Sequence, residues 1–222
     1  MLKLRPGTAK LVRMKRLARI AGAAAVLLIL FSPSFAILKT GDKVVPFSLK
    51  GVDGKDYTVT MENGKLALII AETAGGETKV AKSCPAALLV DFWATYCIPC
   101  RKAMPRLQRL DTAHAPADGR SDGGLRVVGI ALDEAGGKIV KPFGQKLAIT
   151  YPLLADRPSA APAEGLAATV KDIKKRYQVQ EIPVVYLIDS SGTIVHAHVG
   201  STEKQLAELE TAIKALLGGG KR

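Results

Sequence analysis

The amino-acid sequence predicts an α/β protein: a central mixed β-sheet with helices on both faces and an extra β-hairpin at its N-terminal end. Three observations indicate this architecture. Apolar runs of strand length alternate with amphipathic helical patterns over residues 86–177. Two hairpin patterns precede this region, and a third hairpin followed by a last helix comes after it. A sheet with helices on both faces buries the apolar side of all these elements, and we find no internal repeat or second domain.

The N-terminal part of the domain is predicted to form two hairpins. Residues 41–60 contain two short strands around the Asp53-Gly54 pair, which is a strong hairpin signal. A second hairpin is expected from residues 65–71 and 78–82, and it ends just before Cys84.

The central part begins with Ala86–Trp93, an apolar run that predicts a buried strand. Beyond it, Met104, Leu107 and Leu110 recur at helical spacing, which predicts a helix that carries Cys100. The elements expected next are a loop (111–124), a central parallel strand (125–133), a helix (137–148), a short segment (150–154), a loop (157–165) and a helix (166–177).

The C-terminal part is predicted to be a hairpin and a helix. Residues 183–189 and 193–199 form strands joined by a Ser-Ser-Gly turn. The last helix opens with Thr202 and Gln205 as a capping box, and Gly218 suits its end. Its apolar face comprises Leu206, Leu209, Ile213 and Leu216.

Residues 1–36 have the pattern of a secretory signal peptide. They hold seven Lys and Arg and no acidic residue, then the apolar run Ile20–Phe31, with small residues before a cleavage point after Ala36. The alternative is an uncleaved membrane anchor through residues 20–38, although this apolar run is short for a span of about 20 residues. In both cases we expect residues 37–222 to form an exported domain, in the periplasm or on the extracytoplasmic face of the cell membrane.

The charge balance does not favour nucleic acid as a partner. The formal charge is +12, and subtracting the seven basic residues of the leader leaves +5. That modest excess is typical of a solvated surface, and no basic stripe interleaved with aromatic residues is present. An apolar content of 48% argues against disorder.

Cys97 and Cys100 form a redox arrangement, because two cysteines separated by two residues follow a strand and start a helix. The thiolate is the reactive form of cysteine, and the unpaired N–H groups and positive dipole end of a helix start favour it at Cys97. Pro99 suits the first helical turn. We expect Cys97 to attack a substrate disulfide and the more buried Cys100 to resolve the mixed disulfide.

Metal and haem sites are weaker interpretations of the same cysteines. A zinc site needs four ligands, and the other candidates supply no second close-spaced pair: Cys84, His114, His196 and His198. The last two lie on one face of a strand and are expected to be exposed. Covalent haem attachment needs a histidine after the second cysteine, and residue 101 is Arg. We therefore expect no metal site and no cofactor.

Asp91 and Pro183 are the other candidate functional residues. Burial of Asp91 in an apolar strand would raise its pKa, which suits a proton carrier near neutral pH. The alternative is that Asp91 points to solvent through a gap in the sheet. Pro183 opens an apolar strand but cannot donate to a ladder, so it should lie at an edge or a special turn.

The segment Phe92–Pro105 resembles the active-site segment of thioredoxin-fold proteins, including the proline five residues after the second cysteine. With Gly41–Leu49, Leu187–Asp189 and the exported context, the chain is similar to the TlpA/ResA-type thiol-disulfide oxidoreductases of the bacterial cell envelope. The similarity covers residues 41 to about 217. It implies a thioredoxin-like fold for this part of the chain.

The resemblance also implies roles for individual residues. The catalytic positions would be the nucleophile Cys97, the resolving thiol Cys100, a cis-proline at Pro183 opposite them, and the buried acid Asp91. The residues expected to bind substrate are Trp93, Ile98, Pro99 and Ile182, the last through its backbone groups.

The expected function is reduction of protein disulfides, for example in cytochrome c maturation, with electrons from a membrane or envelope donor. The alternatives are a disulfide oxidase or isomerase of the same fold, a peroxiredoxin-like enzyme, and a redox-inert binding module. Segments 65–84 and 157–165 look longer than in the family. Cys84 has no counterpart there, and it is interpreted as a buried apolar residue, a mixed-disulfide partner or an interchain link.

Overall fold

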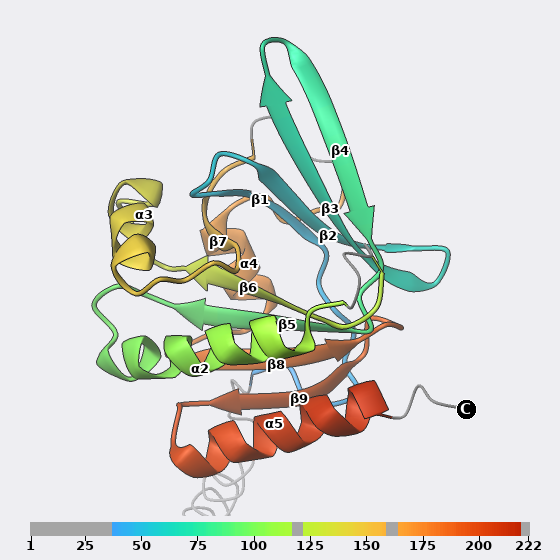
Figure 1. Ribbon diagram of the computed structural model, residues 1–222, viewed down its shortest axis with the longest axis vertical. Helices are drawn as coiled ribbons and strands as arrows, with labels where there is room; N and C mark the ends of the chain where they lie inside the picture. Colours follow the sequence, from blue (N-terminus) through green and yellow to red (C-terminus); the bar gives the residue numbers. More distant parts are fainter. Residues whose placement is uncertain (1–36, 117–121, 159–163, 219–222) are drawn as a thin grey trace, which may run out of the picture. The chain divides into compact units, whose positions relative to one another are not determined.

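The strands of the described residues form one mixed sheet (Figure 1). The computed structural model describes residues 37–116, 122–158 and 164–218. The strands are β1 (Phe47–Gly51), β2 (Asp56–Glu62), β3 (Lys65–Ala74), β4 (Glu77–Ser83), β5 (Ala87–Trp93), β6 (Leu125–Ala131), β7 (Leu153–Asp156), β8 (Val184–Asp189) and β9 (Ile194–Val199). The helices are α2 (Ile98–His114), α3 (Gly137–Lys146), α4 (Val170–Arg176) and α5 (Glu203–Gly218). The strand order is β4-β3-β2-β1-β7-β6-β5-β8-β9.

β5 is the strand that delivers the chain to the cysteines. It pairs in parallel with β6 and antiparallel with β8, and β7 continues the parallel part beyond β6. Every residue of β5 is buried, because both faces of the sheet are covered here. The predicted buried strand and the predicted central parallel strand are confirmed.

Two hydrophobic clusters lie on opposite faces of the sheet, because successive residues of a strand point to opposite faces. Leu88, Val90 and Phe92 of β5 belong to the cluster that α4 covers. Leu89 and Trp93 belong to the cluster that α2, α3 and α5 cover. The prediction of helices on both faces is confirmed.

Local hydrogen bonds set the starts of two helices. The capping box before α5 is confirmed: Gln205 N–H donates to Thr202 Oγ1 (3.3 Å), and Thr202 N–H donates to Gln205 Oε1 (2.9 Å). α4 begins after Thr169, whose Oγ1 accepts the N–H of Asp172 at 3.1 Å. The helix predicted from residue 166 therefore starts too early, since its cap lies at residue 169.

The end of α2 differs from the prediction of a loop over residues 111–124, because α2 continues to His114. Asp111 Oδ1 accepts the N–H of Val127 at 3.1 Å, which ties the end of α2 to β6. Thr112 Oγ1 donates to the carbonyl of Gln108 at 3.0 Å. The polar residues of this segment suggest a loop, but Asp111 and Thr112 form hydrogen bonds that allow the helix to continue.

The second N-terminal hairpin is longer than predicted. β3 and β4 reach a turn at Gly75-Gly76, and Figure 1 shows them extending beyond the strands that follow in the sheet. Cys84, directly after β4, has a free and half-buried thiol. By contrast, α3 ends before the predicted residue 148, and β7 starts after the predicted residue 150.

The signal peptide or anchor predicted for residues 1–36 lies outside the described residues. Ile37 and Leu38, the first described residues, are partly buried and pack against the cluster that α4 covers. Within the described ranges, no helix combines the length and the apolar character needed to cross a membrane.

His196 and His198 are not exposed, and that prediction is wrong. Both lie on β9, which runs beside α5 (Figure 1). His196 Nε2 and His198 Nδ1 are 2.9 Å apart, and His198 is 9% exposed. Burial lowers the pKa of both rings, that of His198 to about 4.

We expect acid to destabilise the fold through this histidine pair. An unfolded histidine binds a proton at about pH 6.5, whereas the folded rings resist it because their pKa values are lowered. The free energy of unfolding should therefore fall as the pH drops below about 6.5. The loss should level off near pH 4, where His198 also gains its proton in the folded protein.

Urea unfolding of His198→Gln at several pH values should show a smaller acid-induced loss than the wild type. His114→Gln, at the end of α2, is the matched control and should behave as the wild type does. An undiminished acid loss in His198→Gln would contradict this origin.

Candidate active site

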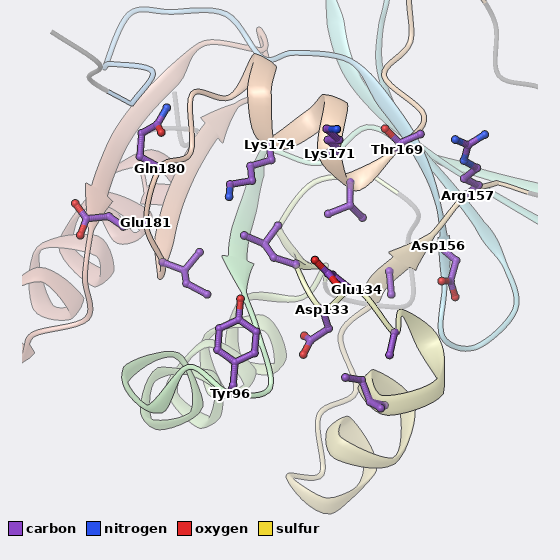
Figure 2. A pocket seen from close by; sticks show the side chains of 16 residues that line it. Tyr96, Asp133, Glu134, Asp156, Arg157, Thr169, Lys171, Lys174, Gln180 and Glu181 are labelled. Carbon is purple, nitrogen blue, oxygen red and sulfur yellow. The ribbon is translucent and has the colours of Figure 1, made fainter.

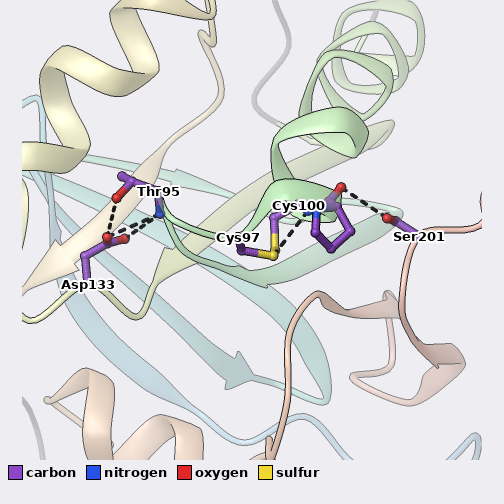
Figure 3. The surroundings of a disulfide bond; sticks show 6 residues. Thr95, Cys97, Cys100, Asp133 and Ser201 are labelled. Carbon is purple, nitrogen blue, oxygen red and sulfur yellow. Dashed lines mark hydrogen bonds between the residues drawn. A yellow bond between two sulfur atoms is a disulfide. The ribbon is translucent and has the colours of Figure 1, made fainter.

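The two cysteines of the motif form a disulfide at the start of α2 (Figure 3). Cys97 is the N-cap residue, with an extended backbone (φ −80°, ψ 102°), and Cys100 lies in the first turn. Their sulfurs are 1.98 Å apart and their Cα atoms 5.3 Å apart. Cys97 is 6% exposed and Cys100 is 1% exposed, so Cys97 is the sulfur that an incoming molecule reaches first.

The start of α2 suits a negatively charged sulfur. The N–H of Cys100 donates to Cys97 Sγ at 3.2 Å, as it would to the oxygen of a capping side chain. Pro99 lies in the first turn, where its missing N–H removes no helical hydrogen bond, and no acidic residue stands in that turn. After reduction, these N–H groups and the helix dipole stabilise the thiolate of Cys97.

The loop between β5 and Cys97 is held by Asp133, a residue that sequence analysis did not single out. Thr95 donates to its carboxylate through the backbone N–H (3.0 and 3.2 Å) and through Oγ1 (2.5 Å) (Figure 3). Asp133 is itself buried, just beyond the end of β6. An available signal was its place after a parallel strand, since the carboxyl ends of neighbouring parallel strands meet at one edge of a sheet.

A second loop reaches the cysteines from the other side. The Ile182-Pro183 peptide bond is cis, and it lies just before β8. Gly200 N–H donates to the carbonyl of Pro183 (2.8 Å), and the neighbouring Ser201 Oγ donates to the carbonyl of Pro99 (3.1 Å). The turn after β9 therefore links the cis-proline to the cysteine-bearing helix, and Ser201 was also missed from the sequence.

Asp91 is buried in the middle of β5, with 2% of its surface exposed. Its neighbours two residues away, Leu89 and Trp93, belong to the same cluster as Cys97 and Cys100, so its side chain shares their face of the sheet. Desolvation raises its pKa to about 7. The alternative of a carboxylate that points to solvent is wrong, and the raised pKa allows Asp91 to exchange a proton near neutral pH.

The residues expected to bind substrate separate into two groups. Ile98 is 62% exposed, Pro99 is exposed, and Ile182 is half-buried, so these three lie on the surface around the disulfide. Trp93 is fully buried, with its ring centroid 5.7 Å from that of Phe143. A docked molecule would not touch Trp93 in this conformation, and its burial indicates an internal role.

A cleft of about 900 Å³ opens beside the disulfide loop (Figure 2). Tyr96 and Ile182 line it on the side of the cysteines, and Tyr96 is 71% exposed. α4 lines it from another side, and Figure 2 shows Lys174 pointing from α4 into the cleft. The volume is in the range of protein ligand sites, and it is large enough to receive a short chain segment.

The described residues contain no group of three or more His, Cys, Asp and Glu side chains placed to hold a metal ion. The groups that the site brings together are two sulfurs, a buried carboxyl group and the backbone N–H groups of a helix start.

The sequence matches a known family and known proteins. The Redoxin family profile matches residues 39–213. Thioredoxin-like protein YneN of Bacillus subtilis is 27% identical over 173 residues, which are 77% of this chain and 78% of that protein. Thiol-disulfide oxidoreductase ResA of Halalkalibacterium halodurans is 21% identical, over 78% of this chain and 76% of that protein.

A solved structure is also similar. A Chlorobium tepidum protein described as a thiol:disulfide interchange protein DsbE is 25% identical, with a TM-score of 0.52. The similarity covers 82% of this chain and 99% of that one. The thioredoxin-like fold expected from the sequence is confirmed.

We expect Asp91→Asn to slow the resolving step while it stabilises the fold. The pKa of Asp91 is about 7 in the folded protein, far above its ordinary value of 3.8. Ionisation of Asp91 therefore costs stability as the pH rises between these values, on the order of 4 kcal/mol at its full extent. The asparagine variant avoids this cost, but it lacks a carboxylate to take the proton of Cys100.

Two measurements check this expectation. Urea unfolding at pH 8 should give a higher free energy of unfolding for Asp91→Asn than for the wild type. Rapid mixing should show that the release of substrate from the mixed disulfide loses its rise with pH around 7. A pH–rate profile that equals the wild-type profile would argue against Asp91 as the proton acceptor.

Proposed function

Because the chain belongs to the Redoxin family, we propose that it reduces disulfide bonds in client proteins outside the cytoplasm. The chain is a thiol-disulfide oxidoreductase, similar to ResA and DsbE proteins, with a cysteine pair that closes a disulfide. The observation that carries the proposal is the unequal placement of the two cysteines, since Cys97 is 6% exposed and Cys100 only 1%.

The proposed reaction transfers two electrons from the enzyme to the client. The Cys97 thiolate attacks one sulfur of the client disulfide, which breaks that bond, forms a mixed disulfide and releases the first client thiolate. Cys100 then gives its proton to Asp91 and attacks Cys97 Sγ. The Cys97–Cys100 disulfide forms, the second client thiolate leaves, and the enzyme ends oxidised. A dithiol donor in the membrane or envelope then reduces it again.

Client binding is proposed at the exposed surface around the disulfide. Ile98 and Pro99 offer an apolar contact beside Cys97, and Ile182 offers backbone groups next to the cis-proline. The 900 Å³ cleft behind Tyr96 and Ile182 would receive the client chain that flanks the attacked cystine. Trp93 would support this surface from below.

The proposed location follows from the leader and from the kind of chemistry. Disulfide exchange with client proteins is useful where disulfides form, which is outside the cytoplasm. Residues 1–36 would direct the domain there, as a cleaved signal peptide or as an anchor through residues 20–38. Apocytochrome c is one client class that fits a reductase in that compartment.

We expect Cys97→Ser to abolish the reduction of insulin disulfides, because the variant lacks the attacking sulfur. Cys100→Ser should stop after the first step and accumulate a mixed disulfide between Cys97 and insulin, detectable by mass spectrometry under non-reducing conditions. Cys84→Ala is the matched control and should retain the wild-type turnover, because Cys84 lies outside the cysteine-bearing helix.

Near-normal turnover in Cys97→Ser would refute the assignment of the nucleophile. Loss of turnover in Cys84→Ala would mean that the third cysteine takes part in the electron transfer.

A further inference from the structure

Three polar groups are buried around Gly129 of β6, on the face of the sheet that carries the disulfide. Gly129 is the direct partner of Asp91 in the parallel β5–β6 pair. A Cβ atom on Gly129 would lie 3.0 Å from Leu153 Cδ2 and from Trp93 Nε1, and 3.3 Å from Tyr151 Cε2. Paired residues of neighbouring strands point to the same face, so the indole and the phenol fill the space beside Asp91.

Both rings bring a hydrogen-bond donor to this place. Trp93 Nε1 and Tyr151 Oη are buried, and neither has a hydrogen-bond partner within the described part of the chain. Tyr151 Cε2 is bonded to the carbon that carries the hydroxyl, so Oη lies close to the space that Gly129 leaves open. Buried donors without acceptors are rare in native proteins, and two of them beside one buried carboxyl group call for an explanation.

The explanation lies in the two protonation states of Asp91. A neutral carboxyl group needs few donors, whereas a buried carboxylate is stable only when donors surround it. Among the described side chains none is hydrogen-bonded to Asp91, and desolvation alone accounts for its raised pKa. The surroundings of Asp91 therefore suit its neutral form, and Trp93 Nε1 and Tyr151 Oη are two nearby donors without a partner in the described part of the chain.

We propose that Tyr151 Oη and Trp93 Nε1 donate hydrogen bonds to Asp91 when it ionises, and that these two positioning residues set the pH at which Asp91 accepts a proton. The inference extends the proposed function, because it concerns the step in which Asp91 takes the proton of Cys100. In that step the S–H bond of Cys100 breaks, an O–H bond forms on Asp91, and the sulfur electron pair attacks Cys97.

Other titratable groups on this face have their own partners. Cys97 and Cys100 share the disulfide in the oxidised protein, and Asp111 accepts the N–H of Val127. His198 lies beyond Val185, which separates it from Asp91 across β8, and it is paired with His196. The residues that α3 and α5 bury here are uncharged: Val140, Gly144, Leu206, Leu209 and Ile213.

The single tryptophan makes the inference testable without a change in the core. In the oxidised protein, the ¹H–¹⁵N resonance of the indole N–H should shift with pH at the midpoint of Asp91. This shift should vanish in Asp91→Asn. An indole resonance that shows no Asp91-dependent titration would overturn the role of Trp93.

Tyr151→Phe tests the second donor and keeps the aromatic ring. The midpoint of Asp91, followed by its infrared carbonyl band, should rise by about one pH unit, because one hydrogen bond favours a charged acceptor by about one to two pKa units. The control is Tyr186→Phe, which also removes a buried tyrosine hydroxyl. Tyr186 lies on the opposite face of the sheet, where its hydroxyl donates to the carbonyl of Tyr177. Its midpoint should stay at the wild-type value.

An unchanged midpoint in Tyr151→Phe would overturn the role of Tyr151. Both titrations use the oxidised protein and no client, so their failure is separate from a failure of the proposed reductase activity. If the protein reduces insulin but shows no titration shifts, the proposed reductase activity stands and the role of Tyr151 and Trp93 is refuted.

Discussion

The rest of the site depends on the hydrogen bond at the start of α2 between the N–H of Cys100 and the sulfur of Cys97. Through this bond the sulfur of Cys97 caps the helix. Two loops hold this helix start from either side, one through Asp133 and Thr95, the other through Ser201 and Pro99. The sheet supplies the frame for both, because β6 and β9 end close to the carboxyl end of β5 (Figure 1). Cys97, Cys100 and the cis-proline are thereby kept in a fixed relation.

Asp91 lowers the stability of the fold when it ionises, whereas the hydrogen bonds of Asp133 and Ser201 stabilise it. A carboxyl group in a fully buried strand costs free energy as soon as it ionises, and an apolar residue would avoid this cost. We propose Asp91 there as the acceptor of the proton that Cys100 loses beneath the surface. Glycine at position 129 fits this arrangement, because a Cβ atom there would press on Trp93 and Leu153 at 3.0 Å and on Tyr151 at 3.3 Å.

Much of this arrangement could be predicted from the sequence, because its signals are local. The apolar run of β5, the helical spacing after Cys97 and the box at Thr202 each act within a few residues. The bonds of Asp133 and Ser201 join residues far apart in the chain. The place of Asp133 after a parallel strand indicates its position but not its partner, and no local pattern predicts the bond of Ser201. The predicted exposure of His196 and His198 was wrong for a similar reason. A polar residue on an edge strand is buried only when another element of the fold covers it. α5 is that element.

The proposed direction of electron flow, from the cysteine pair to a client disulfide, depends on the environment of the two sulfurs at the start of α2. Stabilising the Cys97 thiolate favours the reduced pair and so raises the reduction potential, whereas the low exposure of Cys100 and the buried acid disfavour a second negative charge and limit that rise. The reduction potential of the Cys97–Cys100 couple, measured against a glutathione or dithiothreitol buffer, reports the balance. For the proposed reductase we expect a value near that of thioredoxin, about −270 mV. A value near about −120 mV would identify an oxidant and refute the proposed reductase.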